Sequence, residues 1–239
     1  MALILDDKYE ILEFTGKGNA STVFKARHIR SNEYVAVKSI IKERVSGIPY
    51  HFGIPLNDLD PAFVRILDIF EDEKLIYIVT DYVEGESLQA LRERVRTIPE
   101  GILVTWFRQL AEVLRLLHAQ NPPVLYREMQ PSGVMVQRDG KLKVLEFGVV
   151  TDNENAFAAP EQFMLDQCDE RSDIYALGLT MYYLATGKGP LTPPFGYIPA
   201  RQVNPDISPE LEYILDKCVK YDPEDRYQSA DELLRDLYQ

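Results

Sequence analysis

The apolar residues of this chain change their period once, near residue 86, and that change constrains the fold most. Residues 9–40 and 64–83 are rich in β-branched and aromatic residues separated by turn residues, a pattern typical of short strands. Between Ile102 and His118 the apolar residues recur at helical spacing, as on the buried face of an amphipathic helix. The sequence therefore predicts an α+β fold, with strands in the N-terminal third and helices in the remainder.

The strand-rich part is expected to form a five-stranded antiparallel sheet, with a turn at residues 71–74. Further helices are predicted at Ser172–Thr186, Ser208–Tyr221 and Ser229–Tyr238, and a serine caps the start of the last two. The glycines and prolines of residues 46–58 exclude a long regular helix there. The proline-rich residues 190–209 are expected to form an extended surface loop.

Composition narrows the classes of function. A net charge of −12 argues against a nucleic-acid or anionic-membrane partner, because both need a basic surface. The two cysteines show neither C-x-x-C spacing nor a neighbouring histidine cluster, so a disulfide framework or zinc site is not expected. The N-terminus has no signal-peptide pattern, and the longest apolar stretch, residues 174–185, is too short to span a bilayer. We expect a soluble cytoplasmic protein without membrane insertion.

A series of short motifs carries the functional signal. Two glycines, Gly16 and Gly18, precede the strand that begins at Ser21, and Val35-Ala-Val-Lys38 lies in the next strand. Glycines let backbone amides approach phosphates closely, and a lysine on the next strand neutralises them. Later motifs follow in a fixed order: residues 126–133, Leu145-Glu-Phe-Gly148, Ala159-Pro-Glu161, Asp173-Ile-Tyr-Ala-Leu-Gly178 and Asp222-Pro-Glu-Asp-Arg226.

Over the whole chain these motifs resemble the Hanks-type (eukaryotic-like) Ser/Thr protein kinases of bacteria. The resemblance implies one protein-kinase-like bilobal domain over residues 1–239, with a β-rich N-lobe at about 1–82 and a helical C-lobe at about 84–239. It also implies that Glu161 pairs with Arg226, and that Asp173 braces the catalytic loop. The positions that it assigns to ATP contact are Gly16, Gly18, Val23, Ala36, Lys38, Thr80, Asp81, Val83 and Met135.

This chain departs from the family at the positions that carry the catalytic and metal-binding side chains. Glu128 stands where the family has its catalytic aspartate, and Glu146 stands where it has a metal-binding aspartate. Each glutamate is one methylene longer, and a displacement of about 1 Å can cost about 10²-fold in rate. Gln130 replaces a lysine that neutralises the transferring phosphate. Gly133 replaces an asparagine that binds metal, and glycine offers no side-chain oxygen.

Two supporting features depart from the family as well. Glu154 occupies the place of a threonine that normally tethers the activation segment to the catalytic loop. The family pairs the lysine at position 38 with a glutamate on a helix about twenty residues later. Here Asp58 is near that distance but lies in the segment broken by proline and glycine, and Glu43 lies only five residues away.

These departures support a hypothesis and an alternative. The hypothesis is a pseudokinase, a regulatory or protein-binding module whose partner is another soluble protein, with weak nucleotide binding left open. The alternative is a low-activity ATP-dependent Ser/Thr kinase with Glu128 as base and Glu146 on magnesium or manganese. A different transfer chemistry in the same cleft is conceivable, but no residue singles it out. The sequence does not indicate the oligomeric state or the pathway.

Overall fold

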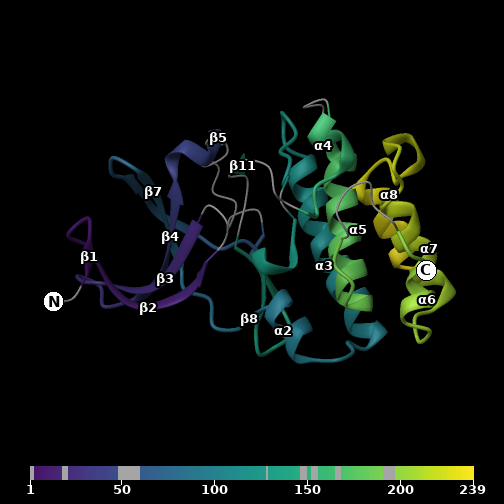
Figure 1. Cartoon of the computed structure of the whole chain (residues 1–239), viewed down its shortest axis with the longest axis horizontal. Coiled ribbons are helices and arrows are strands. Elements are labelled where there is room, and N and C mark those ends of the chain that lie inside the picture. The colour runs from purple at the N-terminus through teal and green to yellow at the C-terminus, as the bar shows by residue number, and fades with distance from the viewer. Residues whose placement is uncertain are drawn as a thin grey trace. The chain divides into compact units, whose positions relative to one another are not determined.

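The computed structural model describes residues 3–17, 21–47, 60–127, 129–145, 150–151, 156–164, 168–190 and 197–239. The chain forms two compact units (Figure 1). Residues 1–84 together with 149–154 make the first unit, and residues 85–148 together with 155–239 make the second. The first unit is built from strands and the second mainly from helices, which confirms the predicted α+β class.

The main sheet of the first unit is antiparallel and has the strand order β1-β2-β3-β4-β7-β6. The prediction of five strands was wrong by one, because β1 adds to the edge of β2 and pairs Ile4 with Glu10. Two residues are too few to show a period of two, so β1 left no pattern in the sequence. The bounds are β1 Ile4–Leu5, β2 Tyr9–Lys17, β3 Ser21–His28, β4 Tyr34–Ile41, β6 Ile66–Glu71 and β7 Leu75–Asp81.

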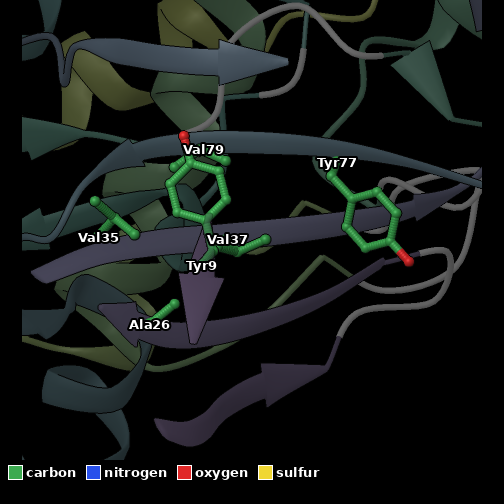
Figure 2. Packing of buried hydrophobic residues seen from close by; sticks show 6 residues of the cluster. All are labelled: Tyr9, Ala26, Val35, Val37, Tyr77 and Val79. Atoms are coloured by element: carbon green, nitrogen blue, oxygen red, sulfur yellow. The ribbon is translucent and has the colours of Figure 1, made fainter. Parts of the chain in front are cut away.

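One face of this sheet is closed by an apolar cluster that Figure 2 shows. Alternate residues of a strand point to opposite faces, so Val35 and Val37 of β4 meet Tyr77 and Val79 of β7 on the same side. Burial of such side chains stabilises the sheet by about 1.5–3 kcal/mol each. The cluster consists of Tyr9, Ala26, Val35, Val37, Tyr77 and Val79.

After β4 the chain makes the 3₁₀ turn Lys42–Arg44 and the short strand β5, Val45–Gly47. Strand β5 pairs antiparallel with β11, Val150–Thr151, and brings Gly47 opposite Val150. Most of the segment 46–58, for which a long helix was excluded, lies outside the described residues, since these do not include 48–58. The suggested partner Asp58 lies there as well.

All the helices predicted for the second unit are present. They are α3 Glu100–His118, α5 Glu170–Thr186, α7 Pro209–Cys218 and α8 Ala230–Leu237. Both predicted serine caps form, since Ser208 Oγ accepts from Leu211 N–H at 3.1 Å and Ser229 Oγ accepts from Glu232 N–H at 3.2 Å. Helix α7 ends before Tyr221, because Asp222 precedes a proline and is held extended.

The sequence did not predict the shorter elements of this unit. These are α2 Leu88–Arg94, α4 Pro160–Met164, α6 Ala200–Val203 and the small sheet β10-β9-β8, made of Leu142–Val144, Val134–Val136 and Glu86–Ser87. Helix α6 corrects the expectation of an extended surface loop at residues 190–209. Its Ala200 and the following Ile207 are buried, so apolar anchors hold the described residues 197–209 against the unit.

Helix α5 is buried along nearly its whole length and packs against α3 and α7. A β-carbon at Gly178 of α5 would lie 2.3 Å from the Cβ of Cys218 at the end of α7. Only glycine permits this approach, so the residue sets how closely the two helices pack. Within the described residues, every helix is too short or too polar to cross a bilayer.

Candidate functional site

The first unit brings most of its predicted site residues onto one face of the sheet. Strand pairing sets Val23 opposite both Gly16 and Lys38, and it sets Ala36 opposite Thr80. Residues that face one another across antiparallel strands share a face. Gly16, Val23, Ala36, Lys38 and Thr80 therefore lie together, on the face opposite the Tyr9 cluster. The family resemblance assigned these five residues to nucleotide contact, and that assignment stays a prediction.

The two predicted hinge residues follow at the end of β7. The backbone N–H of Asp81 donates to the carbonyl oxygen of Arg65 at 3.1 Å, and its carboxylate accepts two hydrogen bonds from Arg65, at 2.8 and 2.9 Å. Neither of these groups of Asp81 is therefore available to an adenine edge. Among the described residues, the backbone N–H of Val83 has no hydrogen-bond partner. Gly18, the second glycine of the loop, lies outside the described residues.

In the second unit, Asp173 of α5 holds the segment before the catalytic position. Its two carboxylate oxygens accept the backbone N–H groups of Tyr126 and Arg127, each at 2.7 Å. His118 Nε2 lies 2.9 Å from the same carboxylate. Arg127 adopts a left-handed φ of 66°, a strained conformation for an arginine, and the bond to Asp173 stabilises it. Asp173 thus braces this loop, as the resemblance implied.

The loop then makes a 3₁₀ turn over Pro131–Gly133. The carbonyl oxygen of Gln130 accepts from Gly133 N–H at 3.1 Å, and the carbonyl oxygen of Gly133 accepts from Leu145 N–H at 2.9 Å. Gln130 is half-buried, and Gly133 is buried with an ordinary negative φ. Met135 lies on β9 opposite Ser87 and Lys143. Glu128 and Glu146, the two chemical glutamates, lie outside the described residues.

An ion pair locks the end of the activation segment to the body of the unit. Arg226 donates from Nη1 and Nη2 to the two carboxylate oxygens of Glu161, at 2.7 and 2.8 Å, and its side chain is fully buried. Burial raises the pKa of Glu161, but hydrogen bonds from Arg226 and Ser172 outweigh it, so the net pKa lies below its usual range. The predicted pair of Glu161 and Arg226 therefore forms, with Glu161 ionised at neutral pH.

Gln162 takes part in this region, and the sequence reasoning missed it. Its Oε1 accepts from the backbone N–H of Ala159 at 2.7 Å, and its Nε2 donates to the carbonyl oxygen of Arg127 at 3.3 Å. The side chain thus joins the activation segment to the catalytic loop. In the family a threonine tethers the activation segment to the catalytic loop. Here the side chain of Gln162 connects the two segments instead. Glu154, which replaces that threonine, lies outside the described residues.

The part of the chain that the structure describes offers few side chains that could bind a metal ion together. No group of three histidine, cysteine, aspartate or glutamate side chains gathers there. Of the two positions that hold metal in the family, Gly133 has no side-chain donor and Glu146 is outside this part. The described residues do not fit a two-metal phosphoryl-transfer site.

A family model and curated proteins match nearly the whole chain. The family model described as protein kinase domain matches residues 9–239. A probable serine/threonine-protein kinase of Clostridium perfringens is 28% identical over 98% of this chain and 38% of its own length. The serine/threonine-protein kinase PknB of Mycolicibacterium smegmatis is 27% identical over 98% of this chain and 43% of its own length. The chain thus spans about two fifths of these curated relatives.

Solved structures show the same fold. A double mutant of the PknI kinase domain from Mycobacterium tuberculosis superposes with a TM-score of 0.82 at 21% identity, covering 100% of this chain and 98% of the other. The structure of Rad53 residues 1–466 in complex with AMP-PNP superposes with a TM-score of 0.77 at 23% identity, covering 95% and 64%.

Proposed function

Because the chain belongs to the protein kinase family, we propose that it is a pseudokinase, which acts by binding another soluble protein rather than by transferring phosphate. One observation carries this proposal. The catalytic-loop backbone is braced by Asp173 through two bonds of 2.7 Å, yet the loop offers a neutral amide at Gln130 and no side chain at Gly133. The backbone of the catalytic loop is held as in an active site, but the positive charge of the family's lysine and the metal ligand of its asparagine are missing.

Phosphoryl transfer depends on the groups that are missing. Catalysis in this family is mostly positioning and electrostatic stabilisation, by cations on the phosphates and a base near the acceptor hydroxyl. Gln130 supplies no positive charge, and Gly133 supplies no oxygen ligand. Gly133 does not need to be glycine for its backbone, because its φ is not left-handed. A left-handed backbone therefore does not account for the glycine at this position.

The structural residues have been retained. Asp173 and the pair of Glu161 and Arg226 form the hydrogen bonds expected of them. A chain that kept no function would tend to lose structural and chemical residues alike. Their retention supports a role that needs the folded helical unit, such as presenting a surface to a partner.

A weak kinase remains the second candidate, because the sheet face that carries Gly16, Val23 and Lys38 is intact. In this reading Glu128 acts as the base, and Glu146 binds a single magnesium or manganese ion through its carboxylate. The same face supports weak ATP binding in a pseudokinase. Nucleotide binding alone therefore does not separate the two candidates, whereas phosphate transfer does.

The deciding experiment measures transfer of γ-³²P from ATP to the chain itself and to casein, with magnesium or manganese. The pseudokinase proposal predicts no incorporation above a blank without protein. Lys38→Ala and Lys141→Ala form a matched pair, because Lys141 is an exposed lysine of the second unit at 77% side-chain exposure. Incorporation that Lys38→Ala abolishes and Lys141→Ala leaves intact would refute the proposal and establish the weak kinase.

Nucleotide binding is tested separately by thermal shift with ATP, with and without magnesium. A pseudokinase that keeps the nucleotide face should show a small upward shift that does not depend on metal, because a ligand that binds only the folded state stabilises it. Lys38→Ala should reduce the shift and Lys141→Ala should not. If millimolar ATP gives no shift, nucleotide plays no part in the proposed role.

Restoration gives a third test. A variant with Glu128→Asp, Gln130→Lys, Gly133→Asn and Glu146→Asp returns the family residues to the altered positions. Because Glu154 also departs from the family, we expect only weak transfer from this variant. Full activity would mean that these four side chains alone separate the chain from an active kinase, and that the altered activation segment has no effect.

A further inference from the structure

A pocket of ≈ 370 Å³ opens on the helical unit, and its lining residues include none of the catalytic loop. Its inner wall comes from α5 through Tyr175, Leu179 and Tyr182, and Tyr197 closes one side. The turn after α5 and the residues that follow α7 form the mouth. All of these residues belong to the second unit. The volume lies in the range of small-molecule and side-chain binding sites.

The pocket wall is aromatic and fixed in place. Tyr182 donates its hydroxyl to the carbonyl oxygen of Ile198 at 2.8 Å, and its ring lies 5.3 Å from the ring of Tyr197. The Tyr197 hydroxyl is buried and has no hydrogen-bond partner within the described residues. Native proteins seldom leave a buried hydroxyl in this state. The Tyr197 hydroxyl is therefore a polar group of the pocket that the described residues leave without a hydrogen bond.

Among the described lining residues, one positive charge at the mouth of the pocket has no carboxylate beside it. Lys220 lies 2.6 Å from Asp216, so these two charges cancel. Lys188 is exposed, and among the described residues its ammonium has no carboxylate within ion-pair distance. This cation stands out on a chain whose net charge is −12. A ligand that complements the mouth should therefore carry an acidic group.

The rim favours a protein segment over a free small molecule. Ile198 and Tyr221 line the pocket and are also exposed, at 41% and 61%. Exposed apolar side chains around a pocket with an aromatic wall are typical of a protein interface, where one anchor enters and the rim excludes water. A volume of ≈ 370 Å³ accommodates a single indole or phenyl side chain.

We propose that this pocket docks an aromatic side chain from a short segment of a soluble partner protein, with an acidic residue beside it that pairs with Lys188. The anchor ring packs among Tyr175, Leu179 and Tyr182, while its flanking backbone crosses Ile198 and Tyr221. The proposal rests on the partner-binding role above and names the site and chemistry of that partner.

The test is an array of short fluorescent peptides in which the central position varies over all amino acids, flanked by either aspartate or lysine. Fluorescence polarisation with the whole chain should select tryptophan, phenylalanine or tyrosine at the centre, with aspartate beside it. Replacing the anchor by alanine should weaken binding at least about tenfold. A flat array, or a preference for lysine flanks, would overturn the proposal.

Matched variants locate the binding. Gly189→Trp puts an indole at the mouth, where a β-carbon meets nothing within 4 Å. Gly101→Trp on α3 is the control, because its β-carbon is equally unhindered and it does not line the pocket. We expect Gly189→Trp to abolish peptide binding and Gly101→Trp to preserve it. Lys188→Glu should invert the preference for acidic flanks, and Lys141→Glu should not. Circular dichroism confirms that each variant is folded.

Equal binding by wild type and Gly189→Trp would place the peptide elsewhere and overturn the proposal. Free indole-3-acetate that binds as tightly as the selected peptide would do so too, because the site would then belong to a small molecule. The proposed function fails by a different result, phosphate transfer that depends on Lys38. The two failures are therefore distinguishable.

Discussion

Removal of the Arg226 guanidinium should destabilise the helical unit more than any other single truncation described above. Its nitrogens donate to both carboxylate oxygens of Glu161 and to the carbonyl oxygens of Lys220, Arg171 and Tyr221. Arg226→Ala leaves a half-buried carboxylate without its cation and three carbonyls without a donor. Breaking a buried pair in this way costs about 3–5 kcal/mol. We expect a loss of about 4 kcal/mol in the free energy of unfolding.

A double-mutant cycle separates the charge from the packing. Glu161→Gln removes the negative charge and keeps the shape, and Arg226→Met keeps much of the apolar stem. Because the double variant leaves no buried charge unpaired, it should be more stable than Arg226→Met alone. The expected coupling energy is on the order of 2 kcal/mol. Urea denaturation followed by circular dichroism gives all four free energies.

The same pair gives a pH dependence with a definite sign. The pKa of Glu161 is lower in the folded state than in the unfolded chain. The ion pair therefore contributes its full stability above the unfolded pKa, and the contribution is lost as the pH falls through the folded pKa. Glu161→Gln should flatten the stability curve in that acidic window. If Arg226→Ala costs less than about 1 kcal/mol and the curve keeps its slope in Glu161→Gln, the reasoning is refuted.

Other changes test the fold at separate points. Gly178→Ala places a methyl group 2.3 Å from the Cβ of Cys218, and it should cost about 1–3 kcal/mol in urea denaturation; an unchanged midpoint would contradict the packing. Ser229→Ala removes the cap of α8 and should cost about 1 kcal/mol, whereas Ser229→Asp should cost little. Asp173→Asn leaves one acceptor oxygen for two backbone amides, and their hydrogen exchange should accelerate at least about tenfold by mass spectrometry.

Local patterns were sufficient to predict the long elements. The alternation along β4 and β7 and the helical spacing along α3 follow directly from side-chain burial, and the serine caps mark where α7 and α8 begin. Short elements left no such trace. Helix α6 has four residues between prolines, and its formation depends on the burial of Ala200 against the unit.

The site was predictable only in part, for a physical reason. Asp173, Glu161 and Arg226 were identified because the family resemblance assigns them roles, and the structure shows the hydrogen bonds that those roles require. The bridge made by Gln162 joins two backbone groups 35 and 3 residues away along the chain, at Arg127 and Ala159. Nothing in the spacing of a glutamine indicates which backbone groups folding will bring to its amide.

The close packing of Gly178 against Cys218 also makes that cysteine a natural reporter. Burial raises the pKa of the Cys218 thiol far above its usual range, so the thiolate that reacts with alkylating reagents is scarcely populated in the folded chain. Modification of Cys218 must wait until α5 and α7 separate, whereas Cys168 is half-buried. The rate of iodoacetamide modification at Cys218 therefore measures how often this helix pair opens, without any label having to be introduced.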